Sequence, residues 1–187
     1  APEAADANEA ADVDAANEPN EVGALETANA AVIECHGMID DGLYQSIRRR
    51  SEKAIEQGFD YLIYELQTYG GAVKAADDIS KYLIMEVADR ARTVAYVRTE
   101  AISAGAIVSV SCQDILMRDN THIGDAAPIV MGGGTLEGVE REKMESFVRS
   151  MFARAAEANG YPKALLEAMV TMNMAVYRVM NLQSGKY

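Results

Sequence analysis

Two kinds of apolar pattern alternate along the chain. Short runs rich in β-branched and aromatic residues are typical of buried strands, whereas apolar residues that recur every three or four positions are typical of amphipathic helices. The alternation of the two predicts an α/β fold with a mostly parallel sheet and surrounding helices. The expected strands are residues 31–35, 59–66, 93–97 and 113–118, and the expected helices are about 40–57, 73–88, 136–159 and a further one after Pro162.

The strands at 61–66 and 93–97 are joined by a glycine turn and one helix. Such a connection is right-handed, so these strands should lie parallel and neighbouring. In helix 136–159 the predicted buried stripe is Met144, Phe147, Val148, Met151, Phe152 and Ala155, with Arg141, Glu145 and Arg149 as an exposed ladder. The run 175–179 is typical of a final edge strand.

Composition divides the chain into an acidic arm and one domain. Residues 1–29 are mostly Ala, Glu, Asp and Asn, with no Lys or Arg, so they predict a disordered N-terminal arm or linker. Residues 30–187 are long enough for one globular domain. The glycine-rich segment 131–135 predicts a mobile loop.

Charge and cysteine content exclude several functions. A formal net charge of −12 argues against a nucleic-acid-binding surface. Cys35 and Cys112 make neither a metal site nor a disulfide framework and are expected to be buried free thiols. No apolar run is long enough to span a bilayer and no secretory leader is present, so we expect this domain to be soluble. We also expect no cofactor and no metal.

The chemistry is expected around Ser103, which follows strand 93–97 and precedes a possible helix. A serine at a strand-to-helix turn can expose its hydroxyl and aim the next backbone N–H, that of Ala104, into the same space. The pair Gly70-Gly71 should emerge at the same carboxyl edge of the sheet, where open α/β sheets bind ligands. A serine among small residues is, alternatively, a helix N-cap or a close-packing position.

Three segments occur in an order that resembles the NfeD-type membrane-associated serine proteases, relatives of signal peptide peptidase A and of the Clp protease. They are Ile39-Asp40-Asp41-Gly42, Thr68-Tyr69-Gly70-Gly71, and Ala101-Ile102-Ser103-Ala104-Gly105 followed by Asp125-Ala126-Ala127-Pro128 and Lys143. The resemblance covers about residues 31–180 and implies a Clp/crotonase-like fold of stacked ββα units.

The resemblance implies a serine endopeptidase with a Ser-Lys dyad. Ser103 would be the nucleophile, Lys143 the general base, and the N–H groups of Gly71 and Ala104 the oxyanion hole. Lysine acts as a base only when burial or positive neighbours lower its pKa, and Lys143 flanks the predicted apolar stripe. Snorkelling into solvent is the alternative for this lysine.

The same resemblance implies peptide substrates with apolar segments, which would add as a strand beside Tyr69 and Gly70. It also implies a partner of the stomatin type, a homo-oligomer, and an extracytoplasmic or membrane-associated location for the full-length protein. The family's loop usually reads Asp-Thr-Pro-Gly-Gly, so Gln67 and Tyr69 depart from it and leave specificity open.

Other functions and other bases stay open. A crotonase-like acyl-CoA enzyme would also use two backbone amides, and a catalytically weak or inactive scaffold would keep the fold and bind a partner protein. His122 lies three residues before Asp125, near which the Clp relatives place a histidine base, and is a weak candidate base. His36 is expected to be a strand-end histidine, because spacing identifies no acidic partner for it.

Overall fold

Five parallel strands form one sheet in the computed structural model, which describes residues 27–129, 137–180, 182–183 and 185. The strand order is β1-β2-β3-β4, and β5 pairs with β3 beyond the end of β4. β3 is therefore hydrogen-bonded along both edges. The strands are β1 (Ala30–Ile39), β2 (Tyr61–Gly71), β3 (Arg92–Ile102), β4 (Asp114–Met117) and β5 (His122–Gly124).

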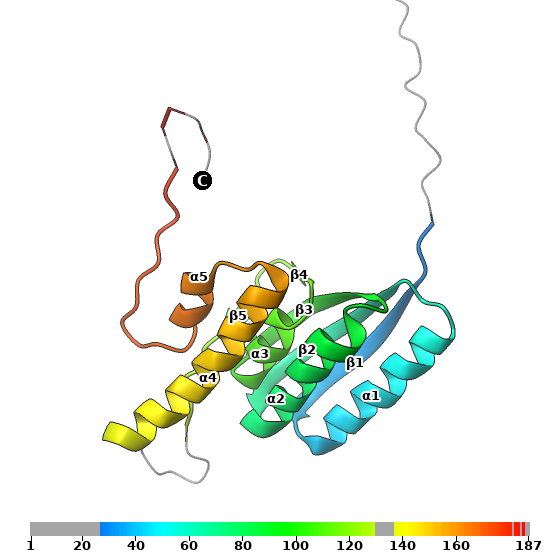
Figure 1. The fold of residues 1–187 in the computed structure, drawn as a ribbon, viewed down its shortest axis with the longest axis horizontal. Helices are drawn as coiled ribbons and strands as arrows, with labels where there is room; N and C mark the ends of the chain where they lie inside the picture. The colour runs from blue at the N-terminus through cyan, green and yellow to red at the C-terminus, as the bar shows by residue number, and fades with distance from the viewer. Residues whose placement is uncertain (1–26, 130–136, 181, 184, 186–187) are drawn as a thin grey trace, which may run out of the picture.

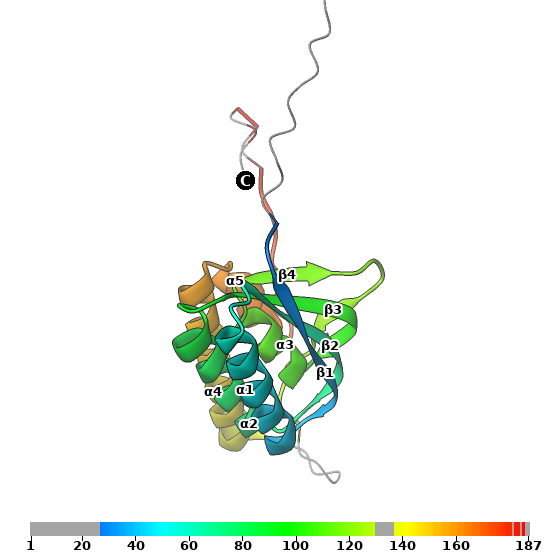
Figure 2. The same ribbon diagram turned by 90° about the vertical axis from the view of Figure 1, so that its right-hand side faces the viewer.

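The helices of the described chain lie on one side of this sheet (Figures 1 and 2). They are α1 (Asp41–Glu56), α2 (Val73–Tyr82) with its π-helical continuation η1 (Leu83–Val87), α3 (Ala104–Val110), α4 (Gly138–Asn159) and α5 (Lys163–Ala168). The expected α/β class with a mostly parallel sheet is confirmed. None of the described helices combines the length and apolarity that crossing a bilayer requires.

The predicted strands are present; β1, β2 and β3 extend beyond the prediction at their carboxyl ends, whereas β4 is shorter than predicted. β1, β2 and β3 continue to Ile39, Gly71 and Ile102, so Gly70 and Gly71 are not a turn but the paired end of β2, opposite Met38 and Ile39. Parallel pairing of β2 with β3 is confirmed. The expected turn before Asp125 contains the short strand β5.

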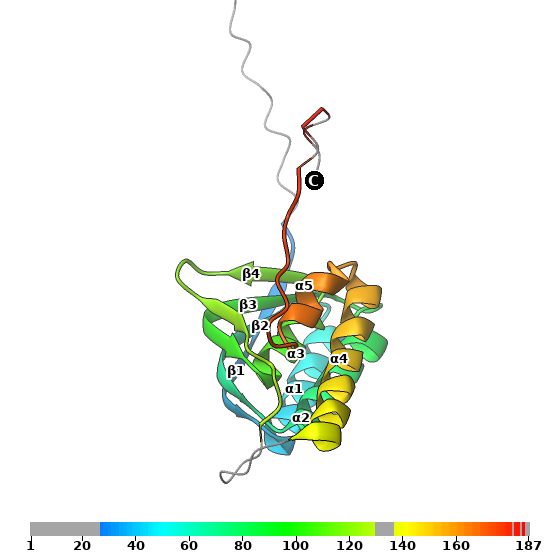
Figure 3. The same cartoon turned by 90° about the vertical axis from the view of Figure 1, so that its left-hand side faces the viewer.

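Three further expectations are not confirmed. The edge strand predicted at 175–179 is wrong, because these residues have no regular secondary structure and Tyr177 and Val179 are about four-fifths exposed. Figure 3 shows this segment running away from the body of the domain. Most of the predicted acidic arm, residues 1–26, and the predicted loop 131–135 lie outside the described residues.

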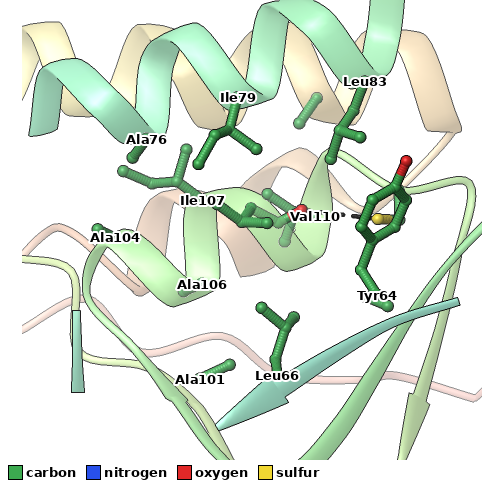
Figure 4. Close-up of a cluster of buried hydrophobic side chains, with 14 of the residues drawn as sticks. Tyr64, Leu66, Ala76, Ile79, Leu83, Ala101, Ala104, Ala106, Ile107 and Val110 are labelled. Atoms are coloured by element: carbon green, nitrogen blue, oxygen red, sulfur yellow. Dashed lines mark hydrogen bonds between the residues drawn. The ribbon is translucent and has the colours of Figure 1, made fainter. Parts of the chain in front are cut away.

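Helix α3 is the centre of the core. All seven of its residues are buried, since the helix lies between the sheet and helix α2 (Figure 4). Ile107 and Val110 are in the same apolar cluster as Leu66 of β2 and Ile79 of α2. Burial on both sides fixes α3, and with it the strand-to-helix turn that precedes it.

The buried stripe predicted for helix α4 is confirmed from Val148 to Ala155 but not at its start. Met144 and Phe147 are exposed, whereas Val148, Met151 and Phe152 are buried. The first turns of α4 project to one side of the domain in Figure 1, so these two apolar side chains do not reach the core.

The predicted ion-pair ladder of α4 is present. Glu145 accepts from Arg141 at 2.7 Å and from Arg149 at 3.2 Å. Its centre is buried rather than exposed, because Glu145 is only 8% exposed. Paired burial of this kind keeps the carboxylate charged: the hydrogen bond from Arg141 holds the pKa of Glu145 below its ordinary value.

Candidate active site

A pocket of about 970 Å³ opens where the parallel strands end. Its lining comes from the carboxyl ends of β1, β2 and β3, from the start of α3, from the chain after β5, and from Val148 of α4. Open parallel sheets bind ligands at this edge, because loops and helix starts converge there. Ser103, Gly70, Gly71, Ala104 and Tyr69, which the sequence predicts as site residues, all line this pocket.

Ser103 sits at the sharp turn between β3 and α3, as predicted. Its backbone has φ 56° and ψ −116°, a conformation that side chains with a Cβ rarely adopt. The turn is anchored by the Ser103 N–H, which donates to the Gly124 carbonyl at 2.8 Å. Ser103 occupies the N-cap position of α3, but its hydroxyl makes no capping hydrogen bond, so helix capping does not account for a serine here.

Gly70 lies directly against Ser103. A Cβ built on Gly70 would stand 2.8 Å from the Ser103 Cβ and 3.2 Å from its Oγ, and the φ of Gly70 is +112°. Both the space and the backbone conformation therefore require glycine here. Gly71 is equally restricted, since its Cβ would stand 2.1 Å from the Ile39 carbonyl oxygen.

Ala104 opens helix α3 immediately after Ser103. The N–H groups of a helix's first turn have no partner four residues earlier, so they are free to bind an oxygen near the turn. Ala104 is 1% exposed and lines the pocket. The chain thus places one fixed N–H donor next to the Ser103 hydroxyl without any side-chain donor.

The structure does not bring Lys143 into this pocket. Lys143 is exposed near the start of α4, where it lines a separate hollow of about 540 Å³ with Gly138, Val139, Glu142 and Ser146. Among the described residues of α4, Val148 is the one that lines the Ser103 pocket. Five residues correspond to about 140° of rotation around a helix, so Lys143 and Val148 face largely different directions.

His36 does have an acidic partner, contrary to the expectation from spacing. Its Nε2 lies 2.9 Å from the Glu65 Oε1 on the neighbouring strand, and Arg98 of β3 donates to the same oxygen at 3.0 Å. Burial raises the pKa of Glu65, but the hydrogen bonds from Arg98 and His36 outweigh it, so the pKa lies below its ordinary value. His36 also lines the Ser103 pocket, whereas His122 is exposed on β5 and does not.

Two carboxylates, Glu100 and Asp125, line the pocket together with the exposed ring of Tyr69, which is 79% accessible. Asp125 has φ 52°, in the left-handed region that aspartate tolerates better than most residues. Among the described residues, no group of three or more His, Cys, Asp or Glu side chains could hold a metal ion. Cys35 and Cys112 are buried free thiols, as expected.

The sequence of this chain is similar to those of known proteins. The model of the NfeD1b N-terminal domain family matches residues 29–187. A curated relative, the membrane protein NfeD1b of Bacillus subtilis (strain 168), is 30% identical over 135 residues, which make up 72% of this chain. The match spans only 30% of the length of that relative.

Solved structures share the fold at low sequence identity. The 1510-N membrane-bound stomatin-specific protease, solved as a mutant, superposes with a TM-score of 0.69 at 22% identity, over 79% of this chain and 72% of that one. A second mutant of it, in complex with a substrate peptide, has the same TM-score and identity and covers 79% and 68%. ClpP1 from Listeria monocytogenes gives 0.56 at 17% identity, over 73% and 76% of the two chains.

Proposed function

The chain belongs to the family of NfeD1b N-terminal domains, and on this premise we propose that it is a serine endopeptidase in which Ser103 is the nucleophile. The observation that carries the proposal is the backbone of Ser103. A residue with a Cβ held at φ 56° and ψ −116° costs free energy, and such strain is concentrated at functional sites. Acyl-transfer enzymes use a strained strand-to-helix turn to expose a serine hydroxyl.

The N–H groups of Gly71 and Ala104 form the oxyanion hole in this proposal. Both residues line the pocket beside Ser103; Ala104 is buried, and Gly71 packs closely against the backbone of Ile39. Fixed N–H donors stabilise the negative charge that develops on the carbonyl oxygen of the substrate in the transition state. These donors are backbone groups, so stabilisation of the oxyanion needs no histidine.

Lys143 is the general base of the proposal and completes a Ser-Lys dyad. In the described conformation it lies in the separate hollow, so the dyad forms only after the first turns of α4 reorient towards the pocket. Enclosure in an apolar pocket is also what a lysine base requires, and the exposed start of α4 does not provide it. Assembly of the base would thereby be linked to closure around substrate.

The substrate of the proposal is an extended peptide with apolar residues, laid beside Tyr69 and Gly70. Apolar lining from Ile102, Ile107 and Val148 supports this choice. One structural neighbour is described as stomatin-specific and another was solved with a substrate peptide, so we propose a stomatin-type membrane protein as the partner class. The proposal also includes a homo-oligomer and an extracytoplasmic or membrane-associated location of the full-length protein.

Fluorophosphonate labelling followed by peptide mapping tests the proposal. Wild type is compared across pH with Ser103→Ala, Lys143→Ala and the control Lys53→Ala, which removes an exposed lysine from α1. We expect an adduct on Ser103 that forms faster as pH rises, disappears in both site variants and persists in the control. A folded wild type that is never labelled would overturn the proposed activity.

A catalytically weak or inactive scaffold that binds a partner protein is the second candidate. The separation of Lys143 from the Ser103 pocket favours it, because a serine without a base within reach has little nucleophilicity. The two candidates differ in one measurable property. If the protein is a scaffold, wild type and Ser103→Ala should bind an apolar peptide equally well, and neither should release a cleaved product.

A further inference from the structure

Thr68 is a buried polar residue at the base of the candidate site. It is 1% exposed and lies on β2, two residues before Gly70. Its Oγ1 donates to the Gly37 carbonyl at 2.5 Å and accepts from the Gly70 N–H at 3.0 Å. Its methyl group also packs under α3, since a Cβ on Gly105 would stand 2.6 Å from the Thr68 Cγ2.

These contacts lie where the strand registers change. The β1-β2 register shifts between His36 and Met38, at Gly37, and the β2-β3 register shifts between Leu66 and Thr68. A shift leaves local backbone groups without ladder partners and re-aims the strand that follows it. The Thr68 hydroxyl supplies those partners on both sides, to a carbonyl on β1 and to an N–H on β2.

We propose that Thr68 is a positioning residue that holds Gly70 against Ser103 and so fixes the spacing between the nucleophile and the β2 side of the oxyanion hole. This inference rests on the proposed function of Ser103. Thr68 acts through two glycines. Its Oγ1 accepts from the N–H of Gly70, on which a Cβ would stand 2.8 Å from the Ser103 Cβ, and its methyl group packs against Gly105, two residues after the nucleophile.

The role predicts a specific kinetic signature. Oxyanion donors contribute mainly in the transition state, so their displacement lowers kcat while KM changes little. A residue that served only the stability of the sheet would change neither constant in the folded protein. The hydroxyl and the methyl group have separate functions here, so Thr68→Ser retains the hydrogen bonds and Thr68→Val retains the shape.

Thr93 offers a matched control. It is 0% exposed on β3, and its Oγ1 likewise accepts a backbone N–H, that of Gln113 at 2.9 Å, but at the opposite end of the strand from Ser103. Thr93→Val therefore removes a buried hydroxyl of the same kind away from the site. Loss of stability in both Val variants is expected, and melting curves establish the temperature at which each is folded.

The experiment measures the fluorophosphonate labelling rate of Ser103 in wild type, Thr68→Val, Thr68→Ser and Thr93→Val, all below their melting transitions. We expect Thr68→Val to be slower by about tenfold or more, because small displacements of reacting groups are costly, and Thr68→Ser and Thr93→Val to stay within about threefold of wild type. Equal rates for the two Val variants would overturn the proposal.

Amide NMR shifts provide a readout that does not depend on activity. Thr68→Val should move the amide resonances of Gly70, Gly71, Ser103 and Ala104, while Thr93→Val should leave them in place. If wild type is not labelled at all, the proposed peptidase activity has failed, and these shifts alone decide the positioning role. Unmoved resonances of these amides in Thr68→Val would reject it.

Discussion

The strained backbone of Ser103 leads to a stability prediction that can be tested without a substrate. Ser103→Ala and Ser103→Gly both remove the hydroxyl, but only glycine adopts φ 56° with ψ −116° at little cost. We therefore expect the glycine variant to be more stable than the alanine variant. At ordinary positions the order is reversed, because glycine gains more conformational freedom on unfolding.

The magnitude follows from two opposing terms. A residue in a sparsely populated backbone region costs roughly 1–3 kcal/mol, which glycine avoids. Against this, the greater freedom of glycine in the unfolded chain costs roughly 0.5–1 kcal/mol. The net gain is about 1 kcal/mol, which for a domain of this size raises the melting temperature by roughly 2–4 °C.

Calorimetry and urea unfolding of the two variants measure this difference, and Ser150 provides the control pair. Ser150 is exposed in the middle of α4, where alanine to glycine should lower stability by about 1 kcal/mol. The same chemical change is thus expected to have opposite signs at the two positions. A Ser103→Gly variant that melts at or below Ser103→Ala would refute the argument that strain is stored at this turn.

Three other outcomes are expected. Asp77 accepts hydrogen bonds from Arg154 and from a lysine of its own helix. Burial raises the pKa of Asp77, but these hydrogen bonds outweigh burial and keep the pKa below its ordinary value. The stability that ionised Asp77 gives to the fold is therefore present above about pH 4 and is lost as pH falls further. Asp77→Asn should cost about 1–3 kcal/mol in urea unfolding at pH 7 and progressively less below pH 4, and an equal cost at both would contradict the ion-pair explanation. Burial raises the pKa of Cys35 to about 12 and that of Cys112 well above its ordinary value, so iodoacetamide at pH 8 should leave the native mass unchanged and modify both thiols only in urea. Gly70→Ala should reduce fluorophosphonate labelling about tenfold or more, because its Cβ would displace the candidate nucleophile; labelling at the wild-type rate would argue against the close contact.

Local patterns predicted the sheet and the turn at Ser103 correctly, because both depend on short-range signals. β-branched runs identify strands, and a serine after such a run and before small residues indicates the turn. The ends of β1 and β2 were missed because Gly37, Gly70 and Gly71 interrupt the strand pattern. These residues belong to strands through pairing across the sheet, which no local pattern records.

Tertiary context accounts for the other differences. The buried stripe of α4 was predicted to begin too early, because Met144 and Phe147 are apolar but lie where the helix leaves the body of the domain. The partner of His36, Glu65, is 29 residues away and adjacent only through the strand register. The location of Lys143 relative to Ser103 depends on how α4 packs against the sheet, which helical periodicity does not specify.

Strand β3 gives the two members of the proposed dyad different susceptibility to local opening. Paired on both edges and backed by buried α3, it holds Ser103 in a part of the fold that opens only with the whole domain. The first turn of α4, with Val139 exposed, contributes no buried side chain, so we expect it to open at lower cost. If Lys143 reaches Ser103 by the proposed movement of α4, the global free energy of unfolding would stay the same, so a melting curve would not distinguish the inactive conformation from the active one.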